Sequence, residues 1–580
     1  MEPRPREVQY SPVAGHLVLV LVVVLVLDSG RARCWWAGLS NGNKADLDSP
    51  TFCRPNFEDE DDDEYEYEAS HEWHLTTPLE VFDYPLDLMR LTFTICLCIV
   101  LCTLTGCIVV GPKYHRPAAT EESLPSSYKE IPAHYKNSEG WDIAQPRDAM
   151  LRGEWWRVFN DPDLNALEEQ LNINNQNIKE FFQNFMEARA LIAEANAQLY
   201  PTLSANASWT KARTPPLNPI TTILSTLEIS WAPDVWGKVR NAIRSAQYSA
   251  QLSAADVENE KLTEQATLAT LYFQIRGQDT LQQLFNDTIV AFQKALAYNQ
   301  VQYETGITDK ISVVEAENTL QNAEASATNI GVARAQFEHA IAVLLGRVAS
   351  NFSIPVRTLH RSPPRIPVGV PSQLLERRPD IAAAERAMAS ANAQIGQAYA
   401  AYFPEFNLSS DAGFESRHFS NLFDTNNRTW SIGPSASETI FDAGLRTATV
   451  HQFIATYNAD LAAYRQTVLT GFQQVEDALA QIRLYSKQIR EQRDAEKSAE
   501  EFLTLEMGRY QTGIDPYVDV VTAQTTLLTD QQAVITVQVL QMTSAVSLIE
   551  ALGGGWDVSE LPTPSQVSKW PTREESKIQQ

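Results

Sequence analysis

The sequence predicts a mainly helical protein with a small membrane β part, built from one unit that occurs twice. Three observations support this fold class. Two long stretches, residues 234–354 and 435–515, contain no proline and are rich in Ala, Gln, Glu and Leu. Four shorter segments alternate apolar and polar residues, which is the period of a β-strand. Several short motifs also recur at an offset of 207 residues.

Each proline-free stretch predicts a hairpin of two long helices. A helix from Lys238 to Tyr303 would extend on the order of 100 Å at about 1.5 Å per residue. The dipeptide Thr305-Gly306 provides a turn, and a second helix is expected from about Ile311 to Leu345. The second stretch repeats this pattern. The sequence therefore predicts two antiparallel helical hairpins.

The four alternating segments predict strands at about 202–211, 223–232, 405–415 and 428–440. Their apolar positions include Trp209, Trp231 and Trp430, an aromatic type that favours membrane interfaces. About ten residues tilted by about 45° cross a bilayer, and a sheet in lipid must close to satisfy its edges. Bacterial barrels have at least about eight strands, so the chain would have to oligomerise. The alternative is a small soluble sheet packed on helices.

Motif pairs define the repeat boundaries. Tyr303–Ile307 (YETGI) matches Tyr510–Ile514 (YQTGI), and Gly237 matches Gly444 at the same offset. The expected division is an upstream extension over 1–88, a signal peptide over 89–106, an N-terminal segment over 107–153, a first repeat over 154–354, a connector over 355–371, a second repeat over 372–556 and a tail over 557–580.

Two N-terminal segments compete as targeting signals. The apolar run at 17–27 is too short to cross a bilayer but long enough for a signal-peptide core. A second apolar run follows Arg90 and ends in Leu104-Thr105-Gly106-Cys107, which resembles a bacterial lipoprotein signal. That resemblance implies acylation of Cys107, including palmitate, and removal of residues 1–88 and 89–106. The alternative is a short hydrophobic helix that ends in Gly-Cys.

Composition and motifs disfavour several classes of function. The chain has 580 residues and a formal charge of -26, which disfavours a nucleic-acid surface. All six cysteines precede residue 108, so the remaining chain has no disulfide and no thiolate metal site. The pair His71 and His74 lacks further ligand motifs. No nucleophile, P-loop or paired-carboxylate motif is present, so we predict no enzyme activity, no cofactor and no metal.

Several motifs resemble the TolC-like outer-membrane efflux protein family, in its NodT-type lipoprotein subgroup. The motifs are Gly111-Pro112-Lys113-Tyr114, Trp155-Trp156 to Leu164, Leu375 to Ile381 with Arg378-Pro379-Asp380 at its centre, and Ile440-Phe441-Asp442-Ala443-Gly444. The resemblance implies a homotrimer whose twelve strands form an outer-membrane barrel continuous with a periplasmic α-barrel. It also implies a periplasmic adaptor, an inner-membrane RND-type pump, and export of small molecules such as drugs and toxic compounds.

The resemblance places a periplasmic gate at the turn between the last two long helices. Its candidate residues are Tyr510, Gly513, Asp515 and Asp519, because an acidic ring guards the entrance in that family. The alternative is that Asp515 caps a helix whose first residue is Pro516. Within the family-like motifs, Arg378, Pro379 and Asp380 are expected to start a helix, and Gly237 and Gly444 to turn each strand into a helix.

Three other functions stay open at this point. A lipid-anchored coiled-coil scaffold would need sustained heptads and leaves the strands unexplained. A duct for type I protein secretion would share the predicted architecture. A periplasmic enzyme would need a polar cleft that no motif indicates.

Overall fold

The structure, a computed structural model, describes residues 109–120, 128–130, 153–215, 218–359, 362–364, 366 and 374–569. All of these fall in one unit, residues 85–580. The expected extension over 1–88 and signal peptide over 89–106 lie outside the described residues, as does Cys107.

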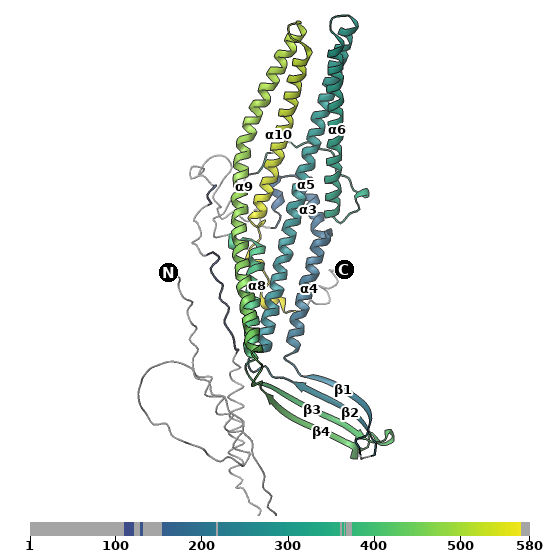
Figure 1. The fold of residues 1–580 in the computed structure, drawn as a ribbon, viewed down its shortest axis with the longest axis vertical. Coiled ribbons are helices and arrows are strands. Elements are labelled where there is room, and N and C mark those ends of the chain that lie inside the picture. The colour runs from purple at the N-terminus through teal and green to yellow at the C-terminus, as the bar shows by residue number, and fades with distance from the viewer. Residues whose placement is uncertain are drawn as a thin grey trace, which may run out of the picture. The chain divides into compact units, whose positions relative to one another are not determined.

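Two long helical hairpins form most of this unit (Figure 1). The first consists of α5 (Lys238–Glu304) and α6 (Lys310–Leu344), and the second of α9 (Leu445–Gln511) and α10 (Tyr517–Ala551). α5 and α9 each have 67 residues, and α6 and α10 each have 35. A helix of 67 residues extends about 100 Å. The two hairpins therefore match in length as well as in sequence.

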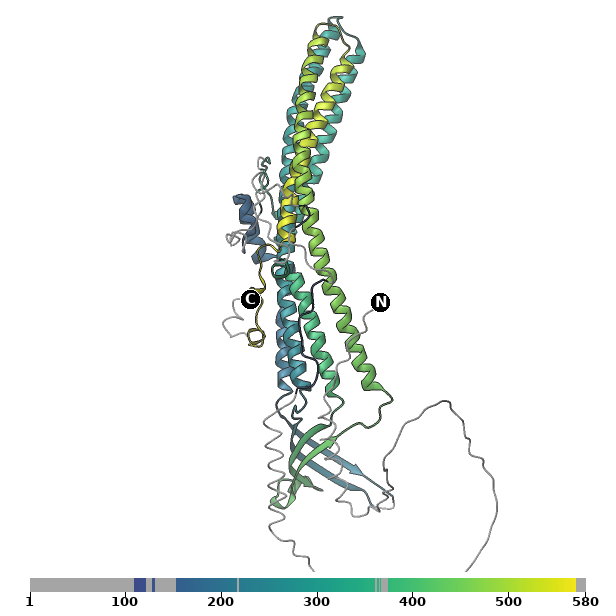
Figure 2. The same ribbon diagram turned by 90° about the vertical axis from the view of Figure 1, so that its left-hand side faces the viewer.

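Shorter helices complete the layer next to the sheet. α4 (Gln176–Ala197) packs on α5, while α8 (Pro379–Ala400) packs against both α5 and α9. α3 (Pro162–Asn174) and the C-terminal segment stand on one side of this layer (Figure 2). The remaining short helices are η2 (Trp155–Phe159), η3 (Ala349–Asn351), α7 (Leu374–Arg377), η5 (Phe419–Asn421), η6 (Thr425–Asn427), η7 (Val558–Glu560) and α11 (Pro564–Val567).

A four-stranded antiparallel sheet lies at the end of the helices opposite the hairpin tips (Figure 1). Its strands are β1 (Thr202–Ala212), β2 (Ile220–Trp231), β3 (Glu405–Ser416) and β4 (Arg428–Ser437), in that order. The alternation predicted four strands, although β2 starts three residues earlier than expected and β4 ends three residues earlier. β4 is shorter because the residues that follow it form the turn into α9.

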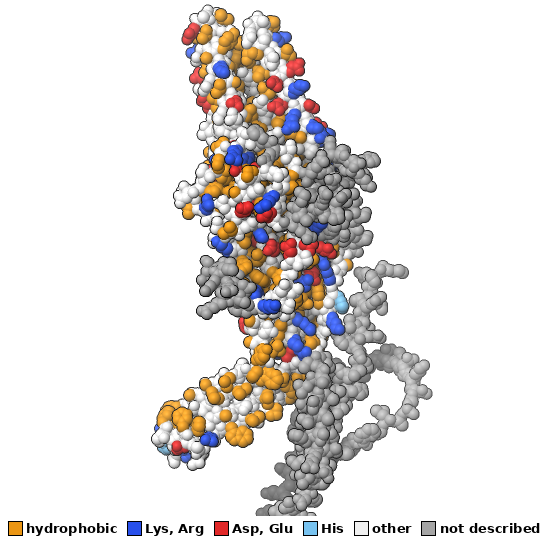
Figure 3. All heavy atoms as spheres, turned by 180° about the vertical axis from the view of Figure 1, so that it is seen from behind, with side chains coloured by type: hydrophobic (Ala, Val, Ile, Leu, Met, Phe, Trp, Pro, Cys, Tyr) orange, Lys and Arg blue, Asp and Glu red, His pale blue; other side chains and the backbone are white. Residues whose placement is uncertain are grey.

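The sheet has one apolar face, and that face is largely exposed. Successive strand residues point to opposite faces, so the register puts Leu203, Leu227 and Trp430 on the same side. The exposed fraction of Trp430 is 74%. Hydrophobic side chains gather over this part of the molecule in Figure 3, at the lower left. The described helices leave this face open, unlike a sheet that is packed on helices.

The main hydrophobic core lies where the short elements meet the long helices. Trp155 and Trp156 of η2 and Phe273 of α5 are among its most buried residues. The connector is attached beside it by the buried carboxylate of Asp279, which pairs with Arg334 Nε at 2.6 Å. Asp279 also accepts a hydrogen bond from the backbone of Arg357 at 2.9 Å.

α10 is the one helix among the described residues that is long and apolar enough to cross a membrane. It packs along α9 and α5 instead, and 56% of its most apolar window is buried. Its hydrophobicity is therefore that of a core helix.

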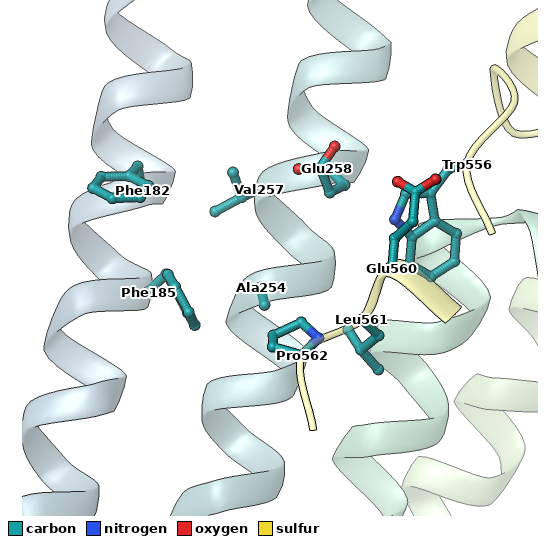
Figure 4. A pocket seen from close by; sticks show the side chains of 9 residues that line it. All are labelled: Phe182, Phe185, Ala254, Val257, Glu258, Trp556, Glu560, Leu561 and Pro562. Atoms are coloured by element: carbon teal, nitrogen blue, oxygen red, sulfur yellow. The ribbon is translucent and has the colours of Figure 1, made fainter. Parts of the chain in front are cut away.

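The C-terminal segment is bound along α4 and α5. Arg189 of α4 donates to the carbonyl of Val567, and Gln251 of α5 donates to the carbonyl of Pro562 at 2.8 Å. A hollow of about 190 Å³ remains between this segment and α4 (Figure 4). Phe182 and Phe185 of α4 border it, so its lining is mostly apolar.

Candidate functional site

The four predicted gate residues lie together at the tip of the second hairpin. Tyr510 is in the last turn of α9, and Asp519 is in the first turn of α10. Gly513 lies between them with a φ of 73°, a left-handed conformation that favours glycine. Asp515 follows in the same turn.

Asp515 forms an ion pair with Arg509 of α9. The guanidinium also donates from Nη2 to Oδ1 of Asp515 at 2.9 Å. This hydrogen bonding holds the pKa of Asp515 below its ordinary value. Asp515 is not the cap of α10, because Pro516 occupies the N-cap position and no side chain caps the helix.

The tip of the first hairpin is built differently. Asp309 is the N-cap of α6 and accepts a hydrogen bond from the backbone of Ser312 at 3.1 Å. Pro516 stands at the position that matches Asp309 at the offset of 207. The capping carboxylate is thus present only in the first hairpin, and the second hairpin pairs its carboxylate with Arg509.

A third carboxylate, Glu506, joins Asp515 and Asp519. Oxygen atoms of these three side chains lie within 4.8 Å of one another. Desolvation and the adjacent Asp515 raise the pKa of Glu506 above its ordinary value. Sequence reasoning missed Glu506, although its position three residues before Arg509 places both on one helix face.

Tyr510 connects the two hairpins. Its hydroxyl lies 2.6 Å from Oδ1 of Asn299 and 2.7 Å from Oε1 of Gln302, both on α5. Burial raises the pKa of Tyr510. Sequence reasoning missed Asn299 and Gln302, because the repeat aligns Tyr510 with Tyr303 and gives no signal for a contact between hairpins.

The polar face of the sheet carries only acidic charges. All four acidic strand residues lie on it, namely Glu228, Glu405, Asp411 and Glu415. The two basic strand residues, Lys211 and Arg428, lie on the other face near strand ends.

Two of these carboxylates face each other across neighbouring strands. Glu228 of β2 is directly opposite Asp411 of β3. Glu228 accepts from Asn206 at 3.1 Å, and Asp411 accepts from Ser431. Within the described part of the chain, neither forms an ion pair with Lys or Arg. Like charges in this arrangement repel each other.

The Arg378 motif begins a helix, and its guanidinium is nearly buried. Pro379 is the first residue of α8, and Asp380 in the first turn pairs with Arg378. Arg378 also donates to the carbonyl of Ala551 at the end of α10, at 3.0 Å, and to Oε1 of Gln474 on α9 at 2.8 Å. The motif therefore joins three helices.

Gly237 and Gly444 occupy equivalent strand-to-helix turns. Both are N-caps of their long helices, with φ values of 80° and 89°. Just before them, Asp234 and Asp442 accept hydrogen bonds from the backbone of the first helical turn. The candidate lipidation residue Cys107 lies outside the described residues.

Comparisons with known proteins agree with this architecture. The sequence profile of the family described as "Outer membrane efflux protein" matches residues 167–347 and 370–554, which together make up more than half of the chain. The two matches correspond to the two halves of the chain.

Curated relatives and solved structures extend the match. The toluene efflux pump outer membrane protein TtgC and the antibiotic efflux pump outer membrane protein ArpC, both of Pseudomonas putida, are each 29% identical over 463 residues. Each alignment covers 78% of this chain and 93% of the relative. The solved outer-membrane channel OprN aligns with a TM-score of 0.71 at 25% identity, covering 77% of this chain and 99% of OprN. The chain belongs to the outer membrane efflux protein family.

Proposed function

We propose that three copies of this chain form the outer-membrane duct of a tripartite efflux pump. The observation that carries this proposal is the sheet, which has an exposed apolar face, an acidic polar face and two edges that are unpaired within the described chain. The sheet leads directly into α5 and α9, which are each about 100 Å long. Such a sheet is suited to lipid on one side and water on the other, provided that its edges close.

The strand order allows closure by identical copies. The four strands are antiparallel throughout, so β1 and β4 run in opposite directions. β4 of one copy can then pair antiparallel with β1 of the next copy, in a head-to-tail ring. Three copies give twelve strands, whereas a barrel of about eight strands is just wide enough for its own side chains. A trimer therefore suits a duct better than a dimer.

A lipid anchor at Cys107 suits the position of the first described residues. Val109 packs against Gly237, at the turn between β2 and α5. The chain reaches this junction two residues after Cys107, and two residues span at most about 7 Å. Acyl chains at this level would enter the bilayer beside the apolar face of the sheet.

The tip of the second hairpin is the proposed gate. Around a threefold axis, three sets of Glu506, Asp515 and Asp519 would repel anions and attract cations. The hydrogen bond of Tyr510 to α5 would hold the two hairpins of each copy together. The helical end of the duct would meet a periplasmic adaptor and an inner-membrane RND-type pump, which supplies the energy.

The names of the relatives support small organic molecules as cargo. The relatives include an antibiotic efflux pump protein and a toluene efflux pump protein. The duct itself is proposed to be passive, and selectivity among such molecules is proposed to belong to the pump.

The test is to purify the protein from an outer membrane and measure both its mass and its conductance. We expect a native mass of three chains, each beginning at acylated Cys107, and discrete conductance steps in a planar bilayer. The variant Cys107→Ser should lose the acyl mass and the signal cleavage. A monomer that gives no conductance would contradict the duct. A conducting trimer with an unprocessed N-terminus would contradict only the anchor.

A further inference from the structure

The strand-to-helix turn of the first repeat is covered by the second repeat. The ring of Trp236 stacks on Phe403, with centroids 4.8 Å apart and planes inclined by 25°. Its Nε1 donates to the carbonyl of Pro404 at 2.8 Å. Val109 covers Gly237 in the same turn, since an added Cβ there would lie 2.9 Å from Val109. This turn is therefore packed within a single chain.

The matching turn of the second repeat is uncovered. Ile440, Phe441 and Leu445 have exposed fractions of 94%, 85% and 67%. An added Cβ on Gly444 would meet nothing within 4 Å. Adjacent apolar side chains with this exposure indicate a surface that a partner covers.

The surface that would receive this turn is also open. Phe403 and Pro404 precede β3, and Tyr200 and Pro201 precede β1 at the corresponding place, with an offset of 203. Phe403 is stacked against Trp236, whereas Tyr200 is 69% exposed. Each repeat thus has a turn and a surface that can receive a turn. Within one chain, the turn of the first repeat packs on the surface of the second, whereas the turn of the second repeat and the surface of the first are both left open.

We propose that Phe441 of one copy packs on Tyr200 and Pro201 of the next copy. This inference rests on the proposed ring of copies. First and second repeats alternate around such a ring. The turn of the first repeat then packs on the second repeat of the same chain, and the turn of the second repeat packs on the first repeat of the next copy. The neighbouring elements follow the same order. Within one chain β2 pairs with β3 and α5 packs on α8. In the ring, β4 would therefore lie beside β1 of the next copy, and α9 beside α4 of the next copy.

The intermolecular contact differs from the internal one in its chemistry. Ala443 stands at the position that matches Trp236, and the aromatic residue of this turn is Phe441, two positions earlier. Phe441 has no indole N–H, so the contact is apolar and lacks the hydrogen bond that Trp236 makes to Pro404. The alternative occupant is membrane lipid. We favour a second copy because a protein surface covers the equivalent turn.

Cysteine cross-linking tests this contact. No cysteine follows Cys107 in the native chain, so Phe441→Cys with Tyr200→Cys introduces the only thiols in the described region. A short bis-maleimide should give covalent dimers and trimers that survive boiling. Each single variant should stay monomeric on the same gel. The matched control pairs Tyr200→Cys with Phe423→Cys, since Phe423 is 70% exposed but lies in the loop between β3 and β4.

The outcomes separate this inference from the duct itself. Interchain bands in the test pair alone support the contact. A conducting trimer without such bands overturns the contact and leaves the proposed function standing. Loss of both the trimer and the conductance in the unmodified protein overturns both.

A second measurement covers the case in which the cysteine variants assemble poorly. Phe441→Trp should keep the temperature at which the trimer dissociates, while Phe441→Ser should lower it. The fluorescence gained by Phe441→Trp, taken as the difference from the native protein, should be quenched by brominated lipid less than the fluorescence that Trp430→Phe removes from the apolar face of the sheet. Strong quenching together with unchanged dissociation of Phe441→Ser would show that lipid covers the turn and would overturn the proposal.

Discussion

The hydroxyl of Tyr510 lies 2.6 Å from Oδ1 of Asn299, and this contact joins the tip of α9 to α5. The hydroxyl has one proton, so it can donate to Asn299 or to Gln302 but not to both at once. Asn299 is fully buried, and its own Nδ2 donates to the carbonyl of Ala295. The acceptor is therefore held in place for the hydroxyl of Tyr510.

Tyr510→Phe should open the tip more often. Removing the hydroxyl deletes a hydrogen bond worth about 1 kcal/mol, which corresponds to about a fivefold change in an open-to-closed ratio. It also leaves Oδ1 of Asn299 without its donor. Single-channel recording should show a higher open fraction in this variant. Tyr402→Phe, which removes a hydroxyl bonded to Thr447 near the sheet, is the control and should behave as the native protein. An equal rise of the open fraction in both variants would mean that the effect of Tyr510→Phe does not come from the gate.

Mild acid should stabilise the tip as it is arranged here. Desolvation and Asp515 raise the pKa of Glu506 above its ordinary 4.5, so the ionised form is disfavoured in this arrangement. Protonation of Glu506 therefore stabilises this arrangement of the tip. The stabilisation is complete below the ordinary pKa of Glu506 and is lost as the pH rises through its raised pKa. Asp515 stays ionised over this range, because Arg509 lowers its pKa. We expect the open fraction to fall in the native protein as the pH is lowered toward the ordinary value of 4.5, and to be nearly independent of pH in Glu506→Gln. A native protein with no pH dependence would refute the role of Glu506.

Replacing Glu168 should stabilise the protein. This α3 residue has no exposed surface, and its carboxylate oxygens have no hydrogen-bond partner among the described residues. Burial raises its pKa well above the ordinary value. Glu168→Met should add about 1–3 kcal/mol by removing an unsatisfied buried group. The gain should grow as the pH rises, because ionisation of the buried carboxyl is the costly step.

The neighbouring residue gives a matched control for this prediction. Glu169 has a half-exposed side chain, 3.7 Å from Arg157 in a surface ion pair. Glu169→Gln should therefore change the thermal unfolding temperature very little. A lower unfolding temperature for Glu168→Met would mean that Glu168 has a stabilising partner when the protein is assembled.

The sequence predicts those features that depend on local periodicity. Alternation with period two located the strands and their apolar face, and the absence of proline located the long helices. The tip turn followed from Gly513 and the repeat. The contacts of Tyr510 with Asn299 and of Arg378 with Ala551 were not predictable, because each joins residues that are distant in sequence and share no periodic signal. The alternative role of Asp515 as a helix cap is wrong, because Pro516 is the N-cap of α10 and the carboxylate of Asp515 pairs with Arg509 instead.

The acidic face of the sheet should contribute to ion selectivity separately from the tip. In the proposed ring of three copies, Glu228 and Asp411 would place six carboxylates on the inner face of the barrel, none of which forms an ion pair with a described Lys or Arg. We expect Glu228→Gln with Asp411→Asn to shift the reversal potential in a KCl gradient toward lower cation preference, while discrete conductance steps persist. The shift should be larger at about 0.01 M than at about 0.1 M salt, because the screening length falls from about 30 Å to about 10 Å. Glu560→Gln, in the C-terminal segment and outside the sheet, removes one negative charge per chain instead of two and should leave the reversal potential unchanged. An unchanged potential in the double variant, together with a shift in Asp515→Asn, would assign selectivity to the hairpin tips alone.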